Sequence, residues 1–285
     1  MMIPSHDITI ALSSLFVLKK QIKISSAEYA FDLLEELKQV ADGILKATDH
    51  PFVKNTLSFI FFDLPKKDLI HTAKELCDRI DSCVSFLDMI ETKIAFNAQS
   101  VIKNGSTVFV HGFSSSVIKA LILAKQLGKR FSVKVAESRP LMDGRKAALM
   151  LAKEDIDVSL HIDSTIGKCL KESDVCFLSA ERLTKEGIYG PTGVSLMAST
   201  AEMLHVPVYF FVNSWTHDDQ IRNDVIGELD SEDIWPNLMA DIAAKSHRHE
   251  AFIPEKNFFF ISELGLHDYS NLIKEADLTY PWLMN

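Results

Sequence analysis

The second part of the chain alternates between strand-like and helix-like segments, and this alternation constrains the fold more than any other feature of the sequence. Because the strand-like runs are apolar throughout, we expect helices to cover both faces of the sheet that they form. The pattern therefore predicts an α/β fold with a doubly wound, mostly parallel, Rossmann-like sheet. The expected strands cover residues 106–112, 130–138, 157–163, 174–182 and 206–214, with residues 257–265 as a further strand at the edge.

The first part of the chain has helical periodicity instead. Apolar side chains recur on one helical face after Ser25 and Ser26, either of which is a candidate N-cap. A second, long helix is expected to open at Pro65 and to close at the Asn104-Gly105 pair, which is a typical C-cap signal. The sequence therefore predicts a helical N-terminal region.

The composition changes near residue 105 without a flexible linker, and a chain of 285 residues is long enough for two domains. We expect a helical domain over residues 1–104 and a Rossmann-like α/β domain over residues 105–285. The formal net charge of −9 argues against a general nucleic-acid binder, because neutralising phosphates requires a basic face.

The cysteine pattern and the apolar runs indicate a cytoplasmic protein. Four cysteines occur without a Cys-x-x-Cys motif, which is typical of free thiols in a reducing compartment. The first apolar run has no basic segment before it and no small-residue cleavage site after it, so we interpret it as a core helix and not as a signal peptide. No apolar run reaches the roughly 18 residues that span a bilayer. The His-x-His pair at His247 and His249 lacks further ligands, so neither a metal nor a cofactor is expected.

Polar clusters follow the expected strands at the positions where open α/β sheets bind ligands. The clusters are residues 111–116, 137–139, 163–165, 179–182 and 213–214. Helices follow the first three clusters closely, and their N-terminal N–H groups and dipoles favour an anion such as a phosphate. Arg139 has the fork geometry to clamp such an anion.

Each of these residues also has a purely structural interpretation. Ser114 and Ser115 suit helix capping as well as phosphate binding. Asp163 is a candidate helix N-cap or a member of the site. Arg139 either contacts the anion or pairs with Glu137 or Asp143 to fix the turn. His111 is interpreted as a structural histidine at a strand end.

Four consecutive segments, residues 107–121, 130–151, 158–183 and 193–214, resemble one protein superfamily in order and spacing. It contains the regulatory alpha, beta and delta subunits of eukaryotic translation initiation factor 2B. It also contains two isomerases, which act on ribose 1,5-bisphosphate and methylthioribose 1-phosphate. The Glu-Ser-Arg-Pro stretch from Glu137, followed by Gly-Arg-Lys from Gly144, is the most specific part of the resemblance.

The chain departs from the isomerase pattern at its chemical centre. Gly112 stands where the isomerases have a catalytic Cys, and Glu181 stands where they have a catalytic Asp. The stretch "GIYGPTGV" lacks the Asn and Lys of the isomerase substrate loop, and "ISSAEYA" lacks the Arg of their Arg-Gly-Ala loop. A thiol and a carboxyl group together can exchange protons, whereas glycine has no group for that task. The alpha subunit also lacks the Cys and carries Glu, so the chain resembles it most in these motifs.

The resemblance implies an alpha-type regulatory binding protein that retains a site for a phosphorylated sugar or a nucleotide. It also implies a homodimer built through the α/β domain, with initiation factor 2 or other initiation-factor subunits as further partners. The expected ligand-binding residues are Gly112, Phe113, Ser114, Ser115, Glu137, Ser138, Arg139, Asp163 and Arg182.

The alternative is an enzyme similar to the sugar-phosphate aldose–ketose isomerases, with altered catalytic residues. Glu181 would be its acid or base, and Arg139, Ser114 and Ser115 would hold phosphate. It would need a second proton-transfer group near Gly112, for which His111 and Asp163 are the candidates.

Overall fold

A computed structural model describes residues 6–48, 50–65, 67–218, 226–239, 242–254 and 257–284. The chain divides into two compact units. The first consists of residues 1–90, 215–217 and 276–285, and the second of residues 91–214 and 218–275.

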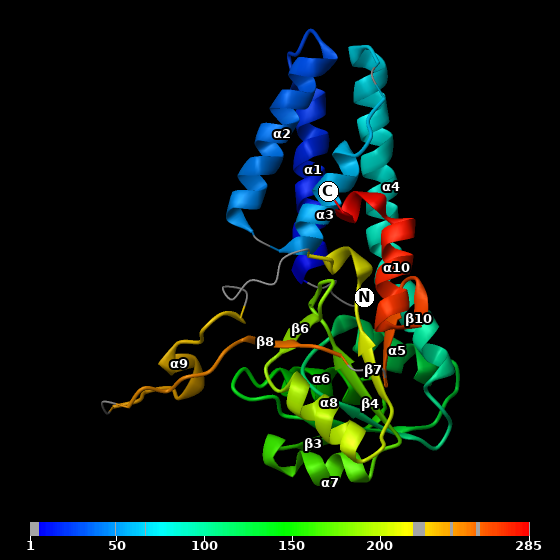
Figure 1. Cartoon of the computed structure of the whole chain (residues 1–285), viewed down its shortest axis with the longest axis vertical. Coiled ribbons are helices and arrows are strands. Elements are labelled where there is room, and N and C mark those ends of the chain that lie inside the picture. Colours follow the sequence, from blue (N-terminus) through cyan, green and yellow to red (C-terminus); the bar gives the residue numbers. More distant parts are fainter. Residues whose placement is uncertain are drawn as a thin grey trace. The chain divides into compact units, whose positions relative to one another are not determined.

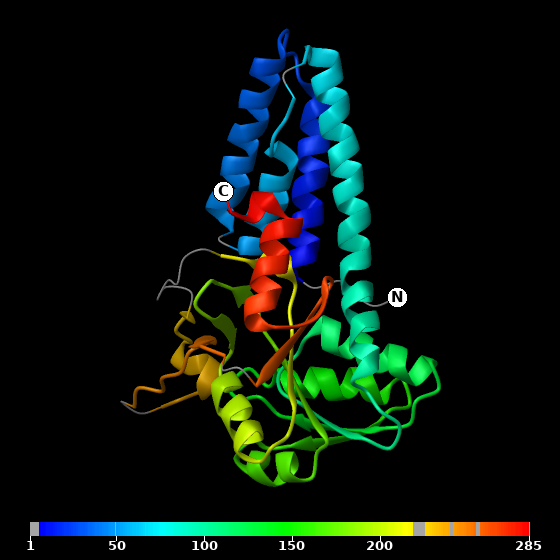
Figure 2. The same cartoon turned by 45° about the vertical axis from the view of Figure 1, so that its right-hand side comes forward.

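The first unit is helical. Its elements are α1 (His6–Ile24), α2 (Ala30–Ala47), α3 (Pro51–Phe61), α4 (Leu69–Asn97) as far as Ile90, the end of α10 (Tyr269–Thr279), and the 3-10 turn η5 (Pro281–Met284). Helices α1, α2 and α4 lie side by side (Figures 1 and 2). Lys19 of α1 pairs with Asp81 of α4, while Leu15, Leu33 and Leu37 are at most 1% exposed. Burial of such leucine side chains supplies most of the stability of an amphipathic helical unit.

Trp215 joins the unit's distant chain segments. Its ring stacks on Phe86 with 4.7 Å between centroids, and it also contacts the rings of Tyr280 and Trp282. The amide of Asn55 donates to the carbonyl oxygens of Trp215 and His217, each at 2.8 Å. These buried contacts explain why residues 215–217 belong to the helical unit.

Three expected helix boundaries were wrong. Tyr29 occupies the N-cap of α2 without a side-chain cap, and Ser25 Oγ instead donates to Glu36 Oε2 at 2.8 Å. The long helix α4 begins at Leu69 and ends at Asn97. At its start the Asp68 carboxylate accepts the backbone N–H of His71 at 3.1 Å. At the start of a helix, a carboxylate can accept a hydrogen bond from the backbone N–H three residues later. A proline side chain has no acceptor for that N–H.

The second unit is built on a mostly parallel sheet, as expected. Within the described residues the sheet has seven strands in the order β10-β9-β7-β4-β1-β2-β3. They are β1 (Thr107–Val110), β2 (Ser132–Ala136), β3 (Asp157–His161), β4 (Val175–Ser179), β7 (Val208–Phe211), β9 (Phe258–Ser262) and β10 (Gly265–Asp268). All neighbours are parallel except the β9–β10 pair. The chain reverses its direction of winding between β1 and β4, so ligands are expected beyond the carboxyl ends of these strands.

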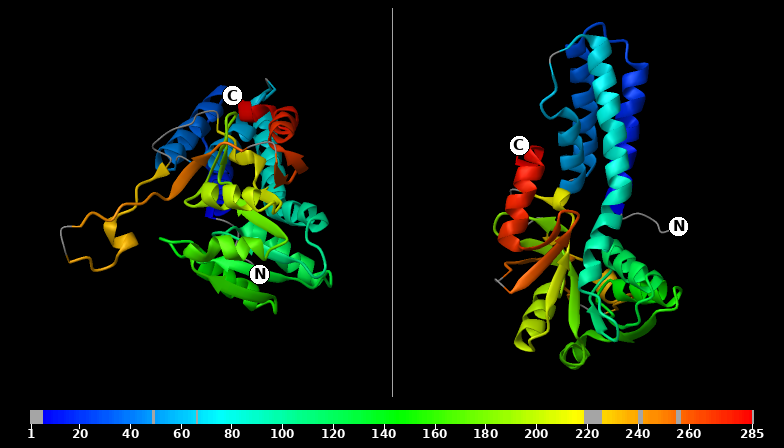
Figure 3. Two further views of the ribbon diagram at one scale, coloured as in Figure 1. Left: turned by 60° about the horizontal axis from the view of Figure 1, so that its bottom comes forward. Right: turned by 90° about the vertical axis from the view of Figure 1, so that its right-hand side faces the viewer.

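Helices cover both faces of this sheet (Figure 3). They are α5 (Ser115–Gln126), α6 (Asp143–Ala152), α7 (Ile166–Lys171) and α8 (Val194–Met203). One core cluster joins α7 and α8 to the inward side chains of the strands, including Phe109, Cys176, Leu178 and Phe210, of which none is exposed. Strands buried on both faces account for the continuous apolar runs in the sequence.

A second, smaller sheet was not expected. It contains β5 (Arg182–Leu183), β6 (Ile188–Pro191) and β8 (His249–Phe252), in that order and antiparallel. These strands have two to four residues, and β6 includes a glycine and a proline. Unlike the equally short β1 and β7, they are not apolar runs, and glycine and proline are depleted in strands. The small sheet matters here because it carries residue 249 and its neighbours to the ends of the large sheet.

Candidate functional site

The turn after β1 is shaped by Gly112. Its φ of +75° lies in the left-handed region that L side chains rarely adopt. A Cβ at this position would meet Pro191 Cγ at 3.5 Å, an ordinary contact, so the backbone conformation and not the space requires glycine. The Gly112 N–H donates to Ser138 Oγ at 2.8 Å, which ties the β1 turn to the β2 turn.

His111 links three turns of the site. It is 3% exposed, its Nε2 lies 3.0 Å from the carbonyl oxygen of Thr192, and its Nδ1 lies 3.1 Å from Ser138 Oγ. Burial lowers the pKa of His111, so the ring is neutral, with Nε2–H donating and Nδ1 accepting. This geometry is that of the structural histidine expected from the sequence.

Asp163 holds the turn after β2. Its Oδ1 accepts the backbone N–H of Ser138 at 2.9 Å, and its Oδ2 accepts that of Arg139 at 2.7 Å. Ser138 has a φ of +63°, a conformation that such local hydrogen bonds help to maintain. Both carboxylate oxygens of Asp163 therefore accept hydrogen bonds from backbone N–H groups.

Gly144 allows α6 to start directly over β2. A Cβ there would lie 1.8 Å from the carbonyl oxygen of Ala136, a distance that no side chain can occupy. The close approach brings the first turn of α6 to the ends of the strands.

The expected pairing of Arg139 with Glu137 is wrong. The Glu137 carboxylate accepts from Arg145 instead, from Nε at 2.8 Å and from Nη2 at 2.5 Å. The Arg139 guanidinium donates from Nη2 to the carbonyl oxygen of Ile234 at 2.7 Å. The turn is therefore held by Arg145, which lies eight residues after Glu137. The residue spacing across this strand-to-helix junction did not predict the pair.

Ser114 and Ser115, which follow β1, have different roles, and only the first caps α5. Ser114 is the N-cap, and its Oγ accepts the Val117 N–H at 3.5 Å. Ser115 Oγ donates to Glu91, a carboxylate that is 4% exposed and also pairs with Lys119. The capping interpretation is confirmed for Ser114, while phosphate contact by these hydroxyls stays a prediction.

A mixed group of charges lies around the first turn of α6. Lys146 Nζ lies 3.9 Å from the centroid of the Phe113 ring, a cation–π contact. The pKa of the exposed Asp143 is raised, chiefly by desolvation of its carboxyl group; the charge of Lys146 opposes the rise, that of Glu181 adds to it, and that of Arg248 opposes it. Lys146 and Arg248 were not among the expected site residues.

Glu181 ends the β4 segment beside the small sheet. Its carboxylate Oε2 lies 2.6 Å from His249 Nε2, and its backbone N–H donates to Tyr189 at 2.8 Å. The Glu181 side chain is 43% exposed. The neighbouring Arg182 pairs with Asp218 at 3.0 Å, and both of these side chains are largely buried. The charge of Arg182 is therefore compensated within the fold.

Residues 247–250 bring a further set of contacts to this edge of the sheet. Thr192 Oγ1 donates to the carbonyl oxygen of His247 at 2.6 Å, and the Thr192 N–H donates to that of Arg248 at 3.1 Å. Glu250 Oε1 accepts the N–H and the hydroxyl of Ser195, in the first turn of α8, at 2.7 and 2.8 Å. The only sequence signal for this segment was its His-x-His spacing.

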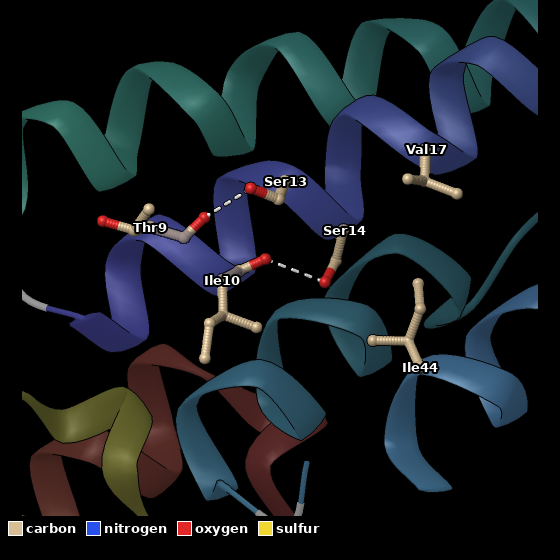
Figure 4. A pocket seen from close by; sticks show the side chains of 6 residues that line it. All are labelled: Thr9, Ile10, Ser13, Ser14, Val17 and Ile44. Carbon is tan, nitrogen blue, oxygen red and sulfur yellow. Dashed lines mark hydrogen bonds between the residues drawn. The ribbon is translucent and has the colours of Figure 1, made fainter. Parts of the chain in front are cut away.

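A separate pocket of about 290 Å³ lies in the helical unit (Figure 4). Its lining residues are Thr9, Ile10, Ser13, Ser14, Val17 and Ile44. The hydroxyls of Ser13 and Ser14 donate to carbonyl oxygens one turn back in α1, each at 2.9 Å. The pocket is therefore effectively apolar and lacks groups for chemistry.

The described ranges contain no group of three or more His, Cys, Asp or Glu side chains placed to hold a metal ion. Among the helices in those ranges, none has both the length and the apolar composition needed to cross a membrane.

The fold and the strand-end groups define a class: doubly wound α/β proteins whose polar turns meet at the carboxyl edge of a parallel sheet. A sequence profile described as the initiation factor 2 subunit family matches residues 5–265. The chain therefore belongs to the initiation factor 2 subunit family.

Individual relatives include both branches named by the resemblance. The chain is 28% identical over 248 residues to translation initiation factor eIF2B subunit alpha of Dictyostelium discoideum, covering 78% of this chain and 75% of the relative. It is 27% identical over 191 residues to ribose 1,5-bisphosphate isomerase of Archaeoglobus fulgidus, covering 63% of this chain and 60% of that enzyme.

A solved structure shares the fold. The translation initiation factor eIF-2B of Pyrococcus horikoshii OT3 superposes with a TM-score of 0.74 at 18% identity, covering 93% of this chain and 92% of that one. The expected fold class and the family resemblance are both confirmed.

Proposed function

We propose that this protein is a non-catalytic, alpha-type regulatory member of the initiation factor 2B family that binds a phosphorylated sugar or a nucleotide at the carboxyl edge of its sheet. The observation that carries the proposal is the left-handed backbone of Gly112, at the position where the resemblance places the isomerase thiol. A cysteine would be strained in that conformation, so the turn is built for glycine and not for a thiol.

The four cysteines of the chain offer no substitute for the thiol that the isomerases have at the position of Gly112. All four are free, and Cys83, Cys169 and Cys176 are buried. Burial raises the pKa of Cys83 to about 12 and also raises the pKa of Cys176, which lies inside β4. A buried thiol with a raised pKa is a poor proton donor or nucleophile at neutral pH.

The two other candidates for proton transfer are engaged elsewhere. His111 is buried with both ring nitrogens in hydrogen bonds, and Asp163 uses both carboxylate oxygens to hold the β2 turn. These contacts support a binding site in preference to an acid–base centre around Gly112.

The isomerase-like alternative is kept as a second candidate because of one cluster. Glu181 lies beside His249, and Asp143 has a raised pKa next to them. Raised carboxyl pKa values are typical of general acids and bases. An isomerase reaction at this site would have to use Glu181, His249 and Asp143.

Assembly completes the proposal. We propose a cytoplasmic homodimer formed through the α/β domain, with initiation-factor subunits as further protein partners. The support is the family membership and the similarity in sequence to an eIF2B alpha subunit.

A thermal-shift screen with product analysis tests the proposed function. The purified protein would be heated with ribose 1,5-bisphosphate, 5-methylthioribose 1-phosphate, AMP or GMP, beside the Arg139→Ala and Glu181→Gln variants. We expect one ligand class to raise the melting temperature of the wild type, less in the variants, and to be recovered unchanged. Conversion of the ligand by the wild type but not by Glu181→Gln would establish the enzyme instead. No shift with any ligand would refute the binding site.

A further inference from the structure

The short strand β8 presents its side chains alternately to two different parts of the second unit. Its register with β6 pairs His249 with Pro191 and Glu250 with Gly190. Glu250 reaches the first turn of α8, whereas His249, on the opposite face of the strand, reaches the Glu181 carboxylate. Strand β8 therefore brings to the site a residue that lies about 70 positions after Glu181 in the sequence.

The contact between His249 and Glu181 has the geometry of a positioning interaction. The distance of 2.6 Å from Nε2 to Oε2 is at the short end for an N–H donor to a carboxylate. The imidazole is 20% exposed, so most of it is packed, while the carboxylate is 43% exposed and still reaches solvent. A packed imidazole against one side of a half-exposed carboxylate reduces the rotamer freedom of that carboxylate and so fixes its direction.

We propose that His249 is the positioning residue for Glu181, and that the two side chains act as one unit that accepts a hydrogen bond from a hydroxyl group of the ligand. This inference rests on the proposed ligand-binding function. A fixed carboxylate accepts hydrogen bonds from ligand O–H groups without first losing conformational entropy. Lys146, which lies in the first turn of α6 with its Nζ 3.9 Å from the centroid of the Phe113 ring, supplies positive charge for the phosphate end of the same ligand.

The test is the binding of ribose 1,5-bisphosphate measured by calorimetry with the full-length protein. The His249→Ala variant removes the donor, and we expect the dissociation constant to rise by roughly 10-fold, because a hydrogen bond to a charged group is lost. The His249→Gln variant keeps an N–H at a similar reach and is expected to recover most of the affinity. The matched control is His247→Ala, because His247 is exposed and contacts Thr192 only through its backbone oxygen.

A double-mutant cycle separates positioning from a merely structural role. If His249 acts through Glu181, then His249→Ala has no further effect on affinity in a Glu181→Ala background. Additive losses in the double variant would overturn the proposal, as would a His249→Ala variant that binds like the wild type. Urea unfolding of each variant identifies any loss that comes from instability. Absence of binding by the wild type to ribose 1,5-bisphosphate, 5-methylthioribose 1-phosphate, AMP and GMP alike would refute the proposed function itself, and is thereby distinct from a failure of the His249 inference alone.

Discussion

At some positions of this protein the backbone geometry determines which residue fits, and at others the chemistry of the side chain does. Gly112 and Gly144 both lie at strand-end turns, but for different physical reasons. The first needs a left-handed φ, and the second needs the absence of a Cβ against Ala136. His111 suits its position because both of its ring nitrogens take part in hydrogen bonds, which join turns that are distant in sequence.

Replacing Gly144 with alanine should destabilise the protein by roughly 3 kcal/mol, because the new Cβ would overlap the Ala136 carbonyl oxygen and force α6 away from β2. Urea unfolding measures this loss. The control is Gly43→Ala in the exposed middle of α2, where a Cβ meets nothing within 4 Å. That change should raise the stability by about 0.5–1 kcal/mol. A Gly144→Ala protein as stable as the wild type would contradict the described packing.

The buried His111 should make the protein less stable in acid. Its pKa is lowered by burial, so as the pH falls through the ordinary histidine value of about 6.5 the unfolded chain takes up a proton that the folded chain does not. The free energy of unfolding should therefore decrease between pH 7.5 and pH 5.5, and by less in His111→Gln than in the wild type. Parallel curves for the two proteins would show that His111 does not contribute.

At the scale of elements, the large sheet was predictable and the small one was not. The continuous apolar runs predicted the parallel strands because burial on both faces leaves that signature. The strands β5, β6 and β8 are short and contain glycine, proline or charged residues, so they leave no such signature. For the same reason the candidate site was predicted only where it follows apolar strands. Gly112, Ser138 and Asp163 do meet in one hydrogen-bonded group. His249 lies on a short strand, and Arg248 directly before it, and no local pattern specifies the pairing partner of that strand.

The β2–α6 turn should depend on Asp163 more than on other acidic residues nearby. The Asp163→Ala variant leaves the N–H groups of Ser138 and Arg139 without their acceptor, and we expect a loss of about 2 kcal/mol in unfolding free energy. Asp157→Ala at the exposed start of β3 is the control and should change stability by less than about 0.5 kcal/mol. Equal effects of the two substitutions would show that Asp163 does not anchor the turn.

For the whole molecule, we propose a family scaffold that binds a ligand and assembles with protein partners. The proposed homodimer predicts a sedimentation coefficient near that of two 32.0 kDa chains at micromolar concentration. Analytical ultracentrifugation over a range of concentrations makes the measurement. A single species of one chain at every concentration would contradict the proposed assembly.

Binding without conversion distinguishes the proposed regulatory protein from an isomerase, and ³¹P NMR of ribose 1,5-bisphosphate with stoichiometric protein measures both. We expect the phosphate resonances to broaden or shift on addition of wild-type protein and to return unchanged when the protein is removed. In the Lys146→Ala variant the perturbation should be weaker, because one positive group for phosphate is lost. New phosphate resonances that grow with time would show turnover, and a spectrum unaffected by the protein would show that the site does not bind this ligand; either result would contradict the account.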